Sequence, residues 1–236
     1  MSNVIEIFSS LQGEGKYVGC RQIFIRTADC NLNCAYCDTE SARADFCNVE
    51  TFAGSMTFSQ IKNPVDAETV AAIVKKFSAE VPTHSVSFTG GEPLLHWQFI
   101  RDVAKLIDAK IFLETNGTLF NELAKIIDAV DIISMDIKLP SVAGNNFERH
   151  REFLKVARAK DLYVKIVISA ETSQAEFDAA VELISPEILL ILQPVTPVKN
   201  VKAISARRIL ELQGRALRKI KNVRVIPQTH RQINIL

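Results

Sequence analysis

The sequence predicts an α/β fold with a mostly parallel sheet, and two alternating patterns indicate it. Short apolar runs such as residues 85–89 (SVSFT) alternate with amphipathic stretches such as residues 66–77 (DAETVAAIVKKF). The apolar runs return about every 20 to 30 residues, which is the spacing of βαβ units. The chain has 236 residues, no linker rich in Pro, Gly or Ser and no clear repeat, so we predict a single domain over residues 1–236.

Each predicted element has a local reason in the sequence. The strands are expected at residues 22–27, 85–89, 110–114, 131–137, 162–168, 188–192 and 223–226, and the helices at residues 66–77, 99–107, 120–127, 147–159, 174–184 and 202–219. The first helix begins at Asp66, a favoured N-cap residue, and places Val70, Val74 and Phe77 on one face. Residues 43–64 carry glycine and proline without a clear period, so we predict an irregular insertion there.

Composition and charge exclude several classes of protein. The formal net charge is +1, so no bulk electrostatic attraction to nucleic acid or to an anionic membrane is expected. No apolar run approaches the roughly 20 residues that span a bilayer, and the opening MSNVIEIFSS lacks the features of a signal peptide. Five cysteines in such a chain argue against a disulfide framework. We therefore expect a cytoplasmic protein whose thiols are available for metal binding or catalysis.

Polar clusters lie at or just after the carboxyl ends of the predicted strands. They are Cys30 and the segments 89–93 (TGGEP), 114–118 (ETNGT), 135–138 (MDIK) and 193–197 (QPVTP). In a parallel barrel these strand ends share one face, and active sites are built on that face. Five clusters on one rim indicate an enzyme.

Three cysteines, Cys30, Cys34 and Cys37, fall within eight positions of the chain. A structural zinc site would take four ligands, and Cys47 or a nearby carboxylate could be the fourth. Iron–sulfur clusters are also held by cysteine thiolates, and three thiolates on a four-iron cluster leave one iron open to another ligand. The spacing favours the cluster over zinc and over unligated thiols.

The segment CNLNCAYC resembles the three-cysteine signature of the radical S-adenosylmethionine (SAM) superfamily, and TGGEP resembles its Gly-Gly-Glu motif. This resemblance implies a partial (incomplete) TIM-type β/α barrel with the cluster and SAM at its carboxyl-terminal rim. Within the superfamily, LQGEG (residues 11–15), FIR (24–26), CNLNCAYCDT, FTGGEP, ETNGT and the final QTHRQINIL resemble the 7-carboxy-7-deazaguanine synthase family of the queuosine and deazapurine pathway.

The family resemblance implies a lyase that converts 6-carboxy-5,6,7,8-tetrahydropterin to 7-carboxy-7-deazaguanine with loss of ammonia. In that family a reduced cluster cleaves SAM, the resulting radical abstracts hydrogen from C6, and the ring contracts. The implied cofactors are a [4Fe–4S] cluster, SAM and Mg²⁺. The implied partners are the pterin substrate, an electron donor such as flavodoxin and a second copy of the chain in a homodimer, with no direct nucleic acid and no membrane.

The same resemblance assigns roles to residues at the matching positions. The cluster would be held by Cys30, Cys34 and Cys37, and Mg²⁺ by Thr39; SAM would meet Tyr36, Asp38, Gly91, Glu92, Ser134, Asp136, Lys138, Gln193, Pro194 and Thr196; the pterin would meet Leu11, Gln12, Gly13, Glu14, Arg26, Thr89, Glu114, His230 and Leu236. The cluster loop would span residues 28–42, and the tail 223–236 would cap the substrate.

Two features depart from the family pattern. Residues 134–138 read SMDIK where the family often has Ser-Pro-Lys, so the alignment of this cofactor-binding segment with the family motif can differ by two residues. Asp29 stands where the family commonly has glycine, and its carboxylate would either lie near the cluster or point to solvent.

Two rival interpretations remain at this stage. A glycyl-radical activating enzyme shares the cysteine spacing and acts on a protein, but it lacks the LQGEG and QTH segments. A zinc-binding interaction module would use Cys30, Cys34, Cys37 and Cys47, but it leaves the polar clusters on the rim unexplained.

Overall fold

The fold is organised around one curved sheet, which the computed structural model describes over residues 1–37, 39–197 and 201–235. Within these residues the strands are β1 (Val4–Leu11), β2 (Arg21–Thr27), β3 (Phe46–Glu50), β4 (Phe58–Lys62), β5 (Ser85–Gly90), β6 (Ile111–Thr115), β7 (Ile132–Asp136), β8 (Asp161–Ile168), β9 (Leu189–Pro194) and β10 (Val223–Val225). Their order across the sheet is β10-β9-β8-β7-β6-β5-β2-β1-β3-β4.

The sheet is mostly parallel and open. Among the described residues only the β1–β2 and β3–β4 pairs are antiparallel, and the run from β2 through β10 is parallel throughout. β4 and β10 form the two edges, so the barrel does not close. The predicted partial barrel with a mostly parallel sheet is confirmed.

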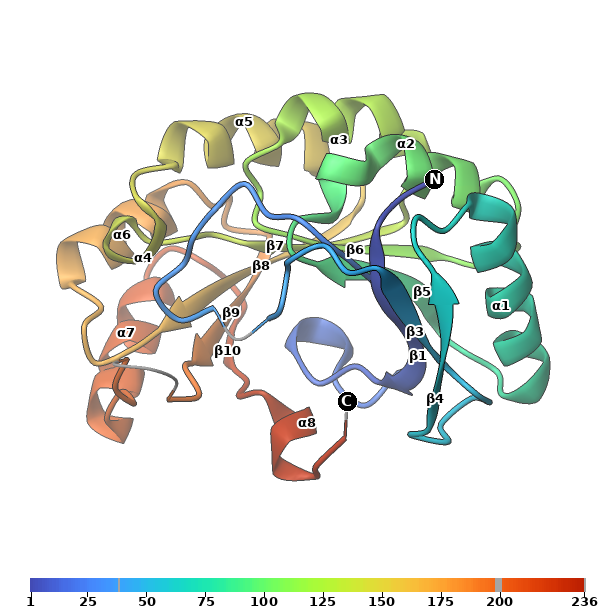
Figure 1. Cartoon of the computed structure of the whole chain (residues 1–236). Helices are drawn as coiled ribbons and strands as arrows, with labels where there is room; N and C mark the ends of the chain where they lie inside the picture. The colour runs from blue at the N-terminus through green and yellow to red at the C-terminus, as the bar shows by residue number, and fades with distance from the viewer. Residues whose placement is uncertain (38, 198–200, 236) are drawn as a thin grey trace.

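Most helices cover the outer side of the sheet, whereas the short last helix, residues 229–232, lies on the inner side (Figure 1). The helices are α1 (Ala67–Glu80), α2 (Trp97–Ala104), α3 (Phe120–Ile126), α4 (Pro140–Ala143), α5 (Phe147–Ala157), α6 (Gln174–Glu182), α7 (Ala206–Ala216) and α8 (Thr229–Gln232), with short 3₁₀ turns at Gly15–Tyr17, Pro93–His96 and Ile127–Ala129. As predicted, Asp66 caps α1 by accepting from the Thr69 amide at 2.7 Å. Val70, Val74 and Phe77 on this helix are buried in the core between helices and sheet.

The prediction of an irregular insertion at residues 43–64 is wrong, because β3 and β4 form an antiparallel hairpin there. The polar strand β4 is mostly exposed at the sheet edge, so its sequence (FSQIK) carries no apolar alternation that would reveal a strand. β1 was also not anticipated as a strand; it lies between β2 and β3 and brings the N-terminal segment into the sheet.

Candidate active site

A cavity of about 640 Å³ lies at the carboxyl ends of the parallel strands, within the roughly 300–1,000 Å³ that small-molecule sites usually span. The predicted residues that line it are Leu11, Gln12, Gly13, Glu14, Arg26, Cys30, Cys34, Tyr36, Cys37, Thr39, Thr89, Gly91, Glu114, Ser134, Asp136, Lys138, Gln193, Thr196 and His230. Glu92 and Pro194 are not among the lining residues. Asp38 and Leu236 lie outside the described residues.

The three clustered cysteines share this cavity, whereas Cys47 does not. The Leu32 amide lies 3.5 Å from Cys30 Sγ, and the Cys37 amide donates to the Cys34 carbonyl at 3.1 Å, so the backbone shapes this loop around the sulfurs. Cys47 is fully buried in the apolar core, and burial raises the pKa of its thiol to about 12. The four-cysteine zinc site is therefore ruled out, while three thiols facing one cavity fit a cluster with one open iron.

Two glycines let the loop after β5 pack against the start of the cysteine loop. A Cβ on Gly91 would stand 1.9 Å from the Asp29 carbonyl oxygen, and Gly90 has a positive φ of 125° beside the Thr27 backbone. The Glu92 amide donates to the Asp29 carbonyl at 2.8 Å across this close approach. Glycine is required here because no side chain fits between the two backbones.

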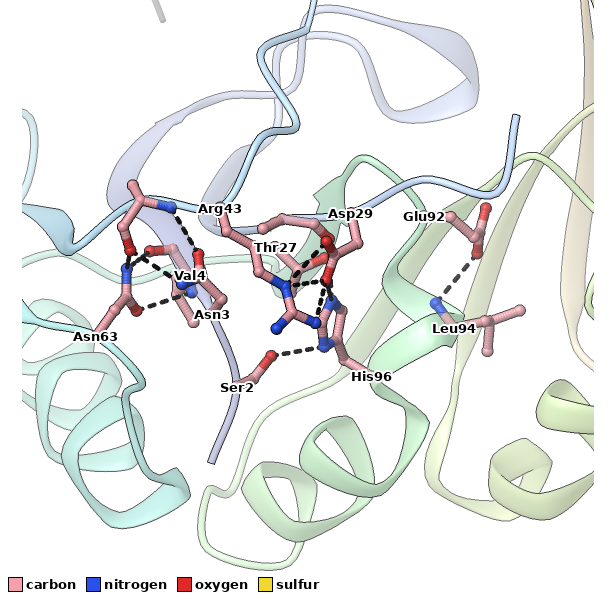
Figure 2. Close-up of polar contacts among 12 residues, drawn as sticks. Ser2, Asn3, Val4, Thr27, Asp29, Arg43, Asn63, Glu92, Leu94 and His96 are labelled. Carbon is pink, nitrogen blue, oxygen red and sulfur yellow. Dashed lines mark hydrogen bonds and ion pairs between the residues drawn. The ribbon is translucent and has the colours of Figure 1, made fainter. Parts of the chain in front are cut away.

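Asp29, the residue before the first cysteine, has a left-handed backbone with φ of 61°, which explains why glycine suits this position. Its carboxylate is held by Arg43 at 2.9 Å and lies 3.7 Å from His96 Nε2 (Figure 2). His96 in turn contacts the Ala28 carbonyl at 2.9 Å and the Ser2 hydroxyl at 2.8 Å. The Asp29 carboxylate is thus engaged in an ion pair and does not line the cavity.

The Glu92 carboxylate is held by hydrogen bonds from the protein. The carboxylate accepts hydrogen bonds from the Leu94 amide at 3.1 Å, from Thr115 Oγ1 at 2.8 Å and from the Asn116 amide at 2.8 Å. It is fully buried, and burial raises its pKa to about 7. Burial and the nearby Glu92 carboxylate both raise the pKa of the Cys30 thiol, so Glu92 lies close to the cysteine loop, and its contact with SAM stays a prediction.

The ends of β7 and β9 place polar groups on the same side of the cavity as the cysteines. Lys138 Nζ bonds Asp136 Oδ2 at 2.8 Å and lies 5.2 Å from the centre of the Tyr36 ring. Burial lowers the pKa of Lys138, but Asp136 and Tyr36 outweigh it and raise that pKa well above its usual value. Asp136 Oδ1 and Gln193 Oε1 are buried and have no hydrogen-bond partner among the described residues.

Two buried acceptors without donors fit a ligand that brings N–H and O–H groups, since an unpaired buried polar atom is costly. SAM carries an amino group and ribose hydroxyls. Ser134, Asp136 and Lys138 all line the cavity, so this segment reaches the site even though its sequence departs from the family pattern.

Strand β6, next to β7, presents a carboxylate held by two donors. Glu114 accepts from Gln12 Nε2 at 2.8 Å and from Thr89 Oγ1 at 2.7 Å. Arg26 is paired through Nε with Glu6 at 2.6 Å, and both side chains are partly exposed to the cavity. Glu6 was missed by sequence reasoning, because β1 was not expected to reach the site.

The tail docks on the loop of residues 11–15. The Thr229 amide donates to the Gly13 carbonyl at 2.9 Å, and a Cβ on Gly13 would stand 2.0 Å from His230 Nδ1. The His230 ring therefore occupies the space that a side chain at position 13 would need, and this close packing brings His230 to the cavity.

Lys165 and Gln228 also line the cavity and were not anticipated. Both contact Glu14: Lys165 forms an ion pair with one oxygen, and Gln228 Nε2 donates to the other at 2.8 Å. The available signal was a single lysine in the apolar run LYVKIVI (residues 162–168), because lysine is rarely buried unless paired.

Comparison with known proteins defines the class first. The Radical SAM superfamily matches residues 24–184, more than half of the chain, and the chain belongs to this superfamily. The crystal structure of QueE from Escherichia coli aligns with a TM-score of 0.61 at 21% identity over 98% of this chain and 95% of that chain. A radical SAM methyltransferase from Sphaerobacter thermophilus aligns with a TM-score of 0.59 at 14% identity, over 88% of this chain and 66% of that one. At these identities the structures show a shared fold.

Sequence relatives narrow the class to one family. A 7-carboxy-7-deazaguanine synthase of Geobacter sulfurreducens is 42% identical over 96% of this chain and 94% of the relative. Another from Methanocaldococcus jannaschii is 36% identical over 98% of this chain and 99% of the relative. The chain belongs to the 7-carboxy-7-deazaguanine synthase family. Within the described residues, no helix is both long and apolar enough to cross a membrane.

Proposed function

We propose that this chain converts 6-carboxy-5,6,7,8-tetrahydropterin to 7-carboxy-7-deazaguanine with loss of ammonia, as a radical SAM lyase of the queuosine and deazapurine pathway. The observation that carries the proposal is one cavity lined both by the three cysteines and by the polar groups of the loop 11–15, β6 and the tail. Its relatives share the synthase name, so the glycyl-radical activating enzyme is not retained as an alternative.

The cluster would be held by Cys30, Cys34 and Cys37, and SAM would lie between that loop and the ends of β7 and β9. When bound, the reduced cluster and SAM supply the hydrogen-abstracting chemistry. Asp136 Oδ1 and Gln193 Oε1 offer acceptors for SAM donors. The ion pair of Lys138 with Asp136 fixes the orientation of both side chains at the end of β7, since each is only 14% exposed.

The pterin would meet the side of the cavity that carries Glu114. A carboxylate that already accepts from Gln12 and Thr89 is fixed in orientation and still has lone pairs for the N–H groups of a pterin edge. Arg26 would take the substrate carboxylate with the guanidinium, whose planar fork suits a carboxylate. Leu11, Gly13, Glu14 and His230 would complete the enclosure from the loop and the tail.

Mg²⁺ binding by Thr39 is part of the proposal. Thr39 lines the cavity next to the cysteine loop, and a hydroxyl together with substrate oxygens and water suits a small hard cation. A homodimer, a flavodoxin-type electron donor and a cytoplasmic location complete the proposal, and these rest on the family resemblance.

Anaerobic reconstitution followed by turnover tests this function. The reconstituted protein should contain about four iron and four sulfide per chain, the content of one [4Fe–4S] cluster. With SAM, reductant and the carboxytetrahydropterin it should release ammonia and a product with the mass of 7-carboxy-7-deazaguanine. Cluster and SAM cleavage without that product, or hydrogen abstraction from a protein instead, would refute the substrate assignment.

A further inference from the structure

Lys165 is a buried cation to which the family resemblance gives no role. It lies on β8, its side chain is 7% exposed, and its strand neighbours Val164 and Ile166 are fully buried. Burying an ammonium is unfavourable unless a partner compensates for the lost water. An apolar residue would be the simplest choice at this position for stability, so the cation calls for another explanation.

The partner of Lys165 joins segments that are far apart in the sequence. Lys165 Nζ forms an ion pair with Glu14 Oε2, and Glu14 Oε1 accepts from Gln228 Nε2 at 2.8 Å. Gln228 Oε1 in turn accepts from Thr196 Oγ1 at 2.5 Å. One carboxylate thus connects the loop 11–15, the sheet, the turn after β9 and the start of the tail.

The charges around this pair explain why the cation must be there. Asp136, Glu114 and Tyr163 face Lys165 in addition to Glu14, and His230 faces Glu14 from the tail. Burial raises the pKa of Glu14, but Lys165 and the two hydrogen bonds outweigh it and leave the pKa at about 2. Burial lowers the pKa of Lys165, and the surrounding acids raise it well above its usual value.

We propose that Lys165 is a positioning residue for the pterin. Its ammonium keeps Glu14 charged and directed between the loop 11–15 and Gln228, and so holds the loop and the tail in place around the substrate. The inference rests on the proposed function for the identity of the substrate. The geometric part, seating of the loop and the tail by Lys165, stands without it.

The test compares Lys165→Met with wild type and with Lys105→Met, an exposed lysine at the end of α2 that does not line the cavity. Cluster content and SAM cleavage without substrate should stay at the wild-type level in both variants. In Lys165→Met the KM for the carboxytetrahydropterin should rise about tenfold or more, because a buried carboxylate loses its cation. Hydrogen exchange of residues 11–15 and 227–232, measured without substrate, should become faster in Lys165→Met only.

The pH profile separates a positioning role from a packing role. Without the cation, burial moves the pKa of Glu14 upward toward neutrality, so kcat/KM of Lys165→Met should gain an acidic limb and increase with pH. The double variant Glu14→Gln/Lys165→Met replaces the buried pair with neutral groups and should fold well. It should retain the high KM and lose the acidic limb.

Unchanged KM, exchange and pH profile in Lys165→Met would overturn the proposal, and so would wild-type KM in the double variant. If the wild type makes no product from this pterin but the tail of Lys165→Met exchanges faster, the substrate assignment fails while the seating role holds. If Lys165→Met does not fold, hydrogen exchange of residues 227–232 in the double variant without substrate decides between the two roles, and exchange at the wild-type rate there would overturn the proposal.

Discussion

Gly13→Ala should displace the His230 ring from its position at the cavity. The added Cβ would stand 2.0 Å from His230 Nδ1, 2.5 Å from Cγ and 2.6 Å from the His230 Cβ, whereas ordinary contact begins at 3.4 Å. The ring must therefore shift by about 3.4 − 2.0 = 1.4 Å, and the bond from the Thr229 amide to the Gly13 carbonyl is strained with it. If His230 makes one neutral hydrogen bond to the pterin, its loss is worth about 0.5–1.5 kcal/mol, or roughly two- to tenfold in kcat/KM.

The assay is kcat/KM for the carboxytetrahydropterin, with SAM cleavage in the absence of substrate as the measure of an intact cluster side. Gly214→Ala is the matched control, because a Cβ there meets no atom within 4 Å and lies in α7, where alanine is favoured by about 0.5–1 kcal/mol. His230→Gly removes all three of the atoms that clash with the new Cβ. Gly13→Ala should then add nothing in the His230→Gly background, and a full additional loss there would refute the reasoning.

Three further outcomes are expected. Cys34→Ala should abolish the iron–sulfur cluster in the visible spectrum while Cys47→Ala keeps it, because Cys34 lines the cavity and Cys47 is buried in the core; equal loss would contradict the three-thiolate site. Thr39→Ala should raise the Mg²⁺ concentration that gives half-maximal rate, whereas Thr39→Ser should not; superimposed Mg²⁺ titrations would mean that Thr39 is not a ligand. Burial lowers the pKa of His150 to about 4, so wild type should lose stability relative to His150→Leu as pH falls from about 6.5 toward 4, by about 2–3 kcal/mol at the acidic end; parallel urea midpoints across that range would refute this.

The sequence predicts the parallel part of the fold well for a physical reason. A strand covered on both faces must be apolar along its length, and runs such as residues 111–113 and 189–192 satisfy that rule. The hairpin of β3 and β4 does not follow this rule, because pairing with β1 stabilises these strands while β4 remains at a solvated edge. The local sequence pattern predicts a strand poorly where pairing with a distant strand provides most of its stability.

The residues of the site also fall into those that the sequence predicts and those that it does not. Side chains at strand ends could be predicted because the topology of a parallel sheet brings those ends together. Their partners could not, since Lys165 and Glu14 are 151 residues apart and Arg26 pairs with Glu6 across two strands. Glu92 is a similar case: its motif is recognisable, but the three hydrogen bonds that hold its carboxylate could not be predicted from the sequence.

The two sides of the cavity are held by different kinds of contact, and this bears on how the site can change. The cysteine loop is fixed at its start by the close approach of Gly90 and Gly91 to the Thr27 and Asp29 backbone, where a side chain on either glycine would collide with main-chain atoms. The tail is fixed largely by side chains, through Gln228 on Glu14 and through His230 on Gly13. Backbone packing admits few substitutions, whereas side-chain contacts can be exchanged one at a time. Substitutions in the tail should therefore change which substrate the site accepts, while the cluster and SAM cleavage persist. The cysteine and Gly-Gly-Glu motifs of the superfamily should tolerate fewer substitutions than the segments that distinguish this family.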